Sequence, residues 1–212
     1  MQAQDQMHPP AVARSPIRPP QRRRLGGAAG NAHLTSLLGG ILLVLLAVEG
    51  ATIPVLHQFL SVHIFVGMLL LGPVALKLAS TGYRAARYYG RGREYMRLGP
   101  PAPLMRFFVA PILVASTLVL FGTGVLLLAV PHRGLVLDLH KASFIVWFGA
   151  MTIHVLTYAA RAGRNLLAEL ERRRTDGRLY RFALAALALG VGLATAAATY
   201  PLADPWFHRL AH

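Results

Sequence analysis

The sequence predicts an all-α integral membrane protein, a bundle of five transmembrane helices with its N-terminus inside and its C-terminus outside. Hydrophobic residues make up 55% of the 212 residues, and they are gathered into long runs. Charged residues make up only 14% of the chain and lie almost entirely between these runs. Apolar runs of about 18 or more residues with few charges are typical of helices that cross a bilayer.

The apolar runs cover residues 34–51, 56–80, 104–130, 139–160 and 180–200. Five Arg residues precede the first run, and one follows the last run. The four successive loops between the runs have none, six, one and seven Arg residues. Because cytoplasmic loops carry the excess of Arg and Lys, this alternation predicts the stated orientation. Residues 1–32 are rich in Pro and Arg and predict a disordered cytoplasmic tail. Residues 33–200 then form the transmembrane domain, and residues 201–212 a short external tail.

The composition narrows the class of protein further. The net charge is +14, but the Arg residues lie in loops between spans, which favours membrane topology over nucleic-acid binding. The chain has no Cys, which excludes disulfides, thiolate metal sites and iron–sulfur ligation by this chain. The bias toward Arg, Ala, Leu and Gly, with only two Lys, suggests a GC-rich bacterial genome. We therefore expect a multi-pass protein of a bacterial plasma membrane, with the lipid bilayer as its surroundings.

Ionisable residues inside membrane helices are costly and usually functional. Two pairs share one spacing, because His63 and Lys77 are fourteen residues apart, and so are His140 and His154. At ~100° and ~1.5 Å per residue, fourteen steps return a side chain to within ~40° of its starting face, ~21 Å along the helix. The second and fourth runs are expected to be parallel. His63 is then level with His140 near the outer surface, and Lys77 is level with His154 near the inner one.

A b-type haem held between two helices needs an axial donor from each side at matching depth, which these pairs would supply. The porphyrin also needs close backbone approach, and its anionic propionates need cations at the membrane surface. Glycines at suitable depths are Gly39, Gly40, Gly67, Gly122 and Gly124. Candidate propionate partners are Arg133 and Lys141 outside, and Tyr83, Arg84 and Arg87 inside.

The paired H-x13-H spacing on two parallel helices resembles the transmembrane di-haem cytochrome b architecture. Respiratory cytochrome b, bacterial cytochrome b561 proteins and ferric-reductase-type membrane domains share this pattern. The resemblance covers the first four runs and implies haems that relay electrons across the membrane. Carried over by residue, it implies that His63 and His140 form the outer axial pair and that His154 is one member of the inner pair.

Lys77 departs from the pattern, since the family has His at this position. Three arrangements are open here. In the first, Lys77 ligates the inner iron through a neutral amine. In the second, His154 alone holds a five-coordinate haem. In the third, the inner haem is absent. Met151 is a weaker substitute donor. Pro73 predicts a kink that would re-aim Lys77 relative to His63.

The sequence thus predicts a membrane b-type cytochrome that carries electrons through two haems, or through one. We further expect that it exchanges electrons with quinone or a redox partner protein, and that it forms a homo- or hetero-oligomer. One alternative is a haem-binding sensor or haem-handling protein with an open inner site. The other is a structural or small-solute membrane protein without haem. Glu49 is expected to be interfacial and Trp147 a core aromatic, and the last run, which has no His, has no assigned role.

Overall fold

The structure, a computed structural model, describes residues 27–96, 102–129, 134–171 and 177–210, and within these ranges every long element is a helix. The chain begins with a hairpin of α1 (Gly27–Thr52) and α2 (Leu56–Tyr89), joined by the short 3-10 turn η1 (Ile53–Val55). The two helices are antiparallel, because the Thr35 and Ser80 hydroxyls hydrogen-bond at one end of the hairpin while Thr52 meets His63 at the other. The all-α prediction is therefore confirmed for the described residues.

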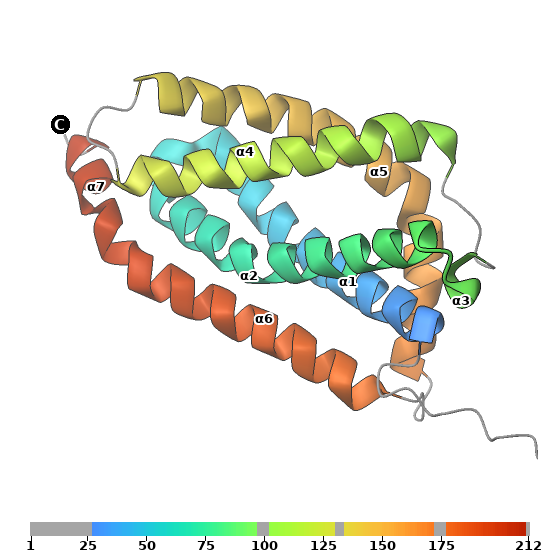
Figure 1. Ribbon diagram of the computed structural model, residues 1–212. Helices are drawn as coiled ribbons and strands as arrows, with labels where there is room; N and C mark the ends of the chain where they lie inside the picture. The colour runs from blue at the N-terminus through green and yellow to red at the C-terminus, as the bar shows by residue number, and fades with distance from the viewer. Residues whose placement is uncertain (1–26, 97–101, 130–133, 172–176, 211–212) are drawn as a thin grey trace, which may run out of the picture.

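The remaining elements complete the bundle (Figure 1). They are α3 (Arg93–Met96), the π-helical turn η2 (Met105–Val109), α4 (Ala110–Ala129), α5 (Gly134–Glu171), α6 (Arg178–Thr199), η3 (Tyr200–Ala203) and α7 (Asp204–Leu210). Each predicted apolar run lies largely or wholly within one or two of these elements, but three of the helices extend beyond the predicted runs. α1 starts before residue 34, α2 continues nine residues past residue 80, and α5 extends beyond both ends of 139–160. Arg84 and Arg87 are therefore helical and do not lie in a loop.

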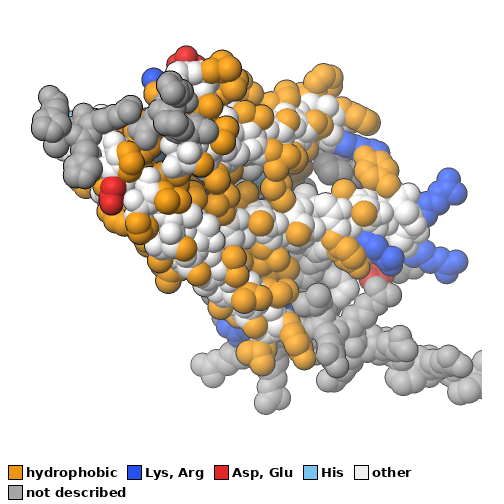
Figure 2. All heavy atoms as spheres, turned by 60° about the vertical axis from the view of Figure 1, so that its left-hand side comes forward, with side chains coloured by type: hydrophobic (Ala, Val, Ile, Leu, Met, Phe, Trp, Pro, Cys, Tyr) orange, Lys and Arg blue, Asp and Glu red, His pale blue; other side chains and the backbone are white. Residues whose placement is uncertain are grey.

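Four helical segments among the described residues are long and apolar enough to cross a membrane: Gly27–Tyr89, Met105–Ala129, Gly134–Ala160 and Arg178–Phe207. The first of them contains the whole α1–α2 hairpin. Large hydrophobic side chains are exposed along every long helix, for example Val44, Leu118, Ile145 and Leu187. Figure 2 shows hydrophobic side chains over most of one face. These features indicate a multi-pass membrane protein, because such a surface is stable against lipid and costly in water.

Helix packing leaves α2 and α5 apart. α2 packs mainly against α6 and α1, whereas α5 packs mainly against α4 and next against α1. Leu38 on α1 and Leu70 on α2 are almost fully buried at the centres of two apolar clusters. α2 also bends about midway along its length (Figure 1). Its backbone is non-helical at Phe59, and Pro73 lies buried inside the helix. A proline removes one backbone hydrogen bond and crowds the preceding turn, so a bend at this point is expected.

α2 and α6 approach closely through two glycines. A Cβ atom added at Gly72 would lie 2.0 Å from the Ala188 carbonyl oxygen, and one added at Gly192 would lie 2.1 Å from that of Leu69. Ala185, Ala188 and Ala196 continue the same buried face of α6. Small residues at helical spacing allow membrane helices to pack backbone to backbone. The last predicted run, which had no assigned role, thus supports the helix that carries His63 and Lys77.

The bundle has two distinct ends, which we call the η1 end and the α3 end after the elements located there (Figure 1). At the η1 end, residues 200–210 form η3 and α7, and Trp206 donates a hydrogen bond to the Leu127 carbonyl at 3.2 Å. The predicted external tail is therefore helical up to residue 210, and Trp206 ties it to α4. At the α3 end lie most of the described Arg residues: Arg84, Arg87, Arg91, Arg93, Arg106, Arg178 and Arg181.

Two predictions lie outside the described residues. They are the disorder of the N-terminal tail, of which residues 1–26 are not described, and the role of Arg133 toward a haem propionate.

Candidate functional site

His63 lies near the start of α2, where two oxygen atoms of α1 approach its Nδ1 atom. The Glu49 Oε1 atom is 3.0 Å from Nδ1, and the Thr52 hydroxyl oxygen is also 3.0 Å away. The Thr52 hydroxyl donates its own proton to the Glu49 backbone carbonyl at 2.6 Å, so toward His63 it acts as an acceptor. In the neutral imidazole this arrangement places the proton on Nδ1 and leaves the lone pair of Nε2 available as a ligand.

His140, on α5, has the same arrangement with different partners on α4. Its Nδ1 atom is 3.1 Å from the Leu120 carbonyl oxygen and 3.2 Å from the Thr123 hydroxyl oxygen. Thr123 donates its proton to the Val119 carbonyl at 2.7 Å, so this hydroxyl is again an acceptor toward the imidazole. The His140 proton is thus also on Nδ1, and Nε2 is again a free donor of electrons.

The two imidazoles lie close enough to interact electrostatically, although α2 and α5 make almost no direct backbone contact. Metal-bound His residues typically donate the ring N–H that faces away from the metal to a carboxylate or a carbonyl, and both partners occur here. Two unprotonated Nε2 atoms at one level, on helices that remain apart, fit the axial donor set of a b-type haem. The residues at the η1 end therefore satisfy the chemical requirements of that cofactor.

The glycines near these residues differ in their surroundings. A Cβ atom at Gly124 would lie 3.3 Å from His140 Cε1, and one at Gly67 would lie 3.3 Å from Glu49 Oε1. Gly39 would meet Lys77 Nζ at the same distance, whereas Gly122 has no neighbour within 4 Å. Gly40 is half-buried in α1. Gly67 and Gly124 thus provide room for the side chains of the site itself.

Gly124→Leu is expected to push the His140 ring out of position and to lower haem binding, because the new side chain would start 3.3 Å from the imidazole. Gly122→Leu is the matched control on the same helix, since its side chain would enter open space. The measurement is haem content per purified chain, determined as the pyridine haemochrome. Equal haem content in the two variants would contradict the placement of His140 against Gly124.

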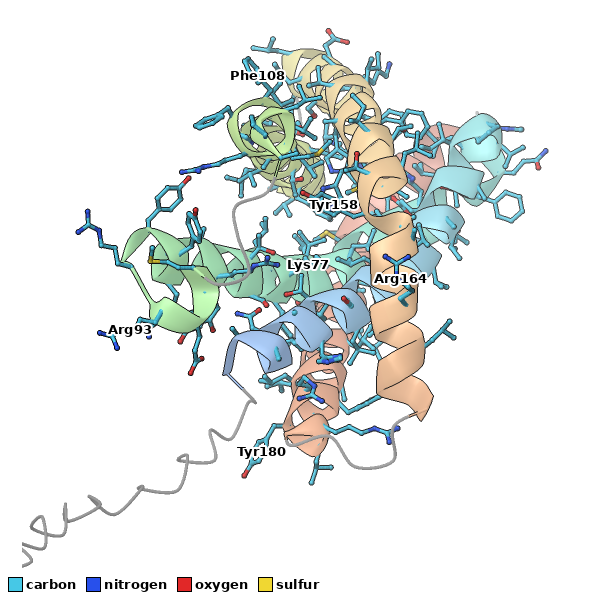
Figure 3. The ribbon with its side chains drawn as sticks, turned by 90° about the vertical axis from the view of Figure 1, so that its right-hand side faces the viewer. Lys77, Arg93, Phe108, Tyr158, Arg164 and Tyr180 are labelled. Carbon is cyan, nitrogen blue, oxygen red and sulfur yellow. The ribbon has the colours of Figure 1, made fainter. Side chains whose placement is uncertain are left out.

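Lys77 lies at the α3 end of the hairpin, and its amine donates a hydrogen bond to the Thr35 backbone carbonyl on α1. Around it Asn31, Thr35 and Ser80 hydrogen-bond to one another, for example from Ser80 Oγ to Asn31 Oδ1 at 2.7 Å. Figure 3 shows Lys77 where α1 and α2 meet, with Tyr158, on α5, above it in this view. The amine is thus held toward α1 by a polar cluster that also ties the two helices together.

His154, half-buried on α5, lies within electrostatic range of Lys77. Its ring packs against Tyr158, with the ring centroids 5.1 Å apart. Met151 is half-buried one turn earlier. Between the two levels, Trp147 is buried and donates its indole N–H to the Thr117 hydroxyl at 3.1 Å. Trp147 is therefore a core contact between α4 and α5.

No protein-family model, curated protein or solved structure matches this chain. Among the described residues, no group of three or more His, Cys, Asp or Glu side chains comes together as a metal site. Axial haem ligation needs only two such side chains.

The predicted propionate partners lie at both ends of the bundle. Lys141 is exposed next to His140, Tyr83 and Arg87 are exposed on the last turns of α2, and Arg84 is half-buried there.

Two further Arg residues have structural contacts or burial within helices. Arg106 donates a hydrogen bond to the Tyr89 hydroxyl at 2.6 Å and stacks on Tyr88, Tyr89 and Phe107. Arg181, counted as a loop residue, is 1% exposed within α6.

Sequence reasoning missed the partners of the two His residues at the η1 end. The Glu49 side chain is 15% exposed, and its Oε1 atom contacts His63. Thr52 and Thr123 were not singled out at all. The signal in the sequence was their position along the helices. Thr52 and Thr123 each lie near the η1 end of the bundle, as do the His residues that they contact.

Proposed function

We propose that this protein is a membrane b-type cytochrome that holds a haem between α2 and α5, with His63 and His140 as the two axial ligands. The observation that carries this proposal is the pair of neighbouring imidazoles whose Nδ1 protons are both engaged by oxygen acceptors, which leaves both Nε2 atoms free. When bound, haem supplies reversible one-electron chemistry at iron. The protein supplies the ligands, their orientation and an apolar surrounding.

The proposed topology has five crossings, with the N-terminus inside. α1 alone has 26 residues and α2 has 34, lengths of ~39 and ~51 Å at ~1.5 Å per residue, which each exceed the ~30 Å apolar core of a bilayer. The hairpin would therefore cross twice. The Arg residues at the α3 end support a cytoplasmic position for that end. The composition supports the plasma membrane of a bacterium.

The electrons would come from and pass to other molecules, since the chain carries no signature of a flavin or nicotinamide site. A membrane quinone or a redox partner protein fits this role. The haem at the η1 end would lie near the outer surface, with Lys141 available for a propionate.

The purified protein is expected to show the reduced-minus-oxidised optical spectrum of a six-coordinate b-type haem. The pyridine haemochrome is expected to give at least one haem per chain. A second haem would indicate that His154 also ligates iron at the α3 end. A protein that contains no haem after expression with ample haem supply would contradict the proposal.

A second candidate function, a haem-binding sensor, is favoured by the position of Lys77. Because its amine is directed toward the Thr35 carbonyl, His154 would hold a haem at the α3 end with an open coordination position. Carbon monoxide would then bind the reduced protein and shift its spectrum. A spectrum that does not change with carbon monoxide would contradict this function and favour electron transfer, which six-coordinate iron serves.

A further inference from the structure

Glu49 is an acidic residue within a membrane-spanning segment, and its carboxylate is directed at His63. One oxygen, Oε1, lies 3.0 Å from His63 Nδ1, while the other, Oε2, is buried and has no hydrogen-bond partner among the described residues. A buried polar atom without a partner carries a free-energy cost, so its retention calls for an explanation. Gly67 makes room for this carboxylate, because a Cβ atom there would lie 3.3 Å from Oε1.

The other imidazole has no carboxylate partner in the part of the chain that the structure describes. The Nδ1 atom of His140 meets two neutral oxygens, the Leu120 carbonyl and the Thr123 hydroxyl. Hydrogen bonds to a carboxylate are roughly twice as strong as those between neutral groups. The two imidazoles are therefore chemically unequal, although the opposite ring nitrogen is free on both.

We propose that Glu49 is a positioning residue that makes His63 the more electron-rich axial ligand and so lowers the reduction potential of the haem at the η1 end. This inference rests on the proposed function. A carboxylate that accepts the outer N–H of a ligating His raises the basicity of that His. A more basic ligand, with a negative charge close by, stabilises the oxidised iron over the reduced iron.

The test is a redox titration of the purified protein, followed by the optical spectrum of the haem. Glu49→Gln keeps the shape of the side chain and an acceptor oxygen but removes the charge. This variant is expected to keep its haem and to show a midpoint potential more positive than that of the wild type. Thr123→Val is the matched control, because it removes a neutral partner of His140 and is expected to cause a smaller shift.

A haem-loaded Glu49→Gln variant with the wild-type midpoint potential would overturn the inference while leaving the proposed function intact. If Glu49→Gln binds no haem, Glu49→Asp becomes the deciding variant. A positioning carboxylate predicts that Asp restores part of the haem content, and an Asp variant as empty as Gln would overturn the inference. A wild-type protein without haem would instead end the proposed function itself, so the two failures are distinguishable.

Discussion

His63→Ala is expected to abolish haem binding at the η1 end, and His140→Ala to do the same. Each substitution removes one of the two proposed axial donors, and even the loss of a partner of a ligand typically costs about 10–100-fold in affinity. The loss of the ligand itself should therefore exceed ~100-fold. The measurement is the pyridine haemochrome, which should fall by one haem per chain in either variant.

His57→Ala is the matched control for this experiment. His57 lies on the same helix, six residues before His63, but its side chain is exposed. Its loss should leave both the haem content and the spectrum unchanged. If His63→Ala retained the full haem content of the wild type, the pairing of α2 with α5 through iron would be wrong. Circular dichroism of each variant would show whether the helices are still folded.

Gly192→Leu is expected to destabilise the bundle strongly. A Cβ atom at this position would lie 2.1 Å from the Leu69 carbonyl oxygen, which belongs to a helix backbone and cannot rotate away. Overpacking of a well-packed core commonly costs ~1–3 kcal/mol, and a whole Leu side chain between two helices in contact should exceed that range. The measurement is thermal unfolding in detergent, followed by circular dichroism, with a clear fall in the midpoint temperature.

Gly190→Leu is the control for this substitution. Gly190 lies two residues away on the exposed side of α6 and has no neighbour within 4 Å, so a Leu there would face lipid. The two variants have the same change in composition and in helix propensity. Equal midpoint temperatures would show that α2 and α6 are not in backbone contact.

Hydropathy predicted the membrane class well but not the ends of the helices. The apolar run that ends near residue 80 marks where the bilayer would end, whereas α2 continues through Arg84 and Arg87 to Tyr89. Arg is a good helix former, so a helix extends into the polar region without any change in backbone structure. A hydropathy pattern therefore reports the surroundings of a helix and cannot locate its end.

The spacing of ionisable residues predicts that His63 is level with His140, and Lys77 with His154, when α2 and α5 run parallel. This prediction was within reach because helix geometry repeats with a fixed rise and angle. Whether these residues bind iron stays a prediction that the proposed variants test.

The sequence alone determined the helical membrane class, because this class follows from periodicity and composition along one chain. Only the tertiary structure decided what each side chain contacts. Glu49 and Thr52 meet His63 across the hairpin, Thr123 meets His140 across α4 and α5, and the Lys77 amine meets the Thr35 carbonyl. Such contacts depend on the rotation and separation of packed helices, which local periodicity does not specify.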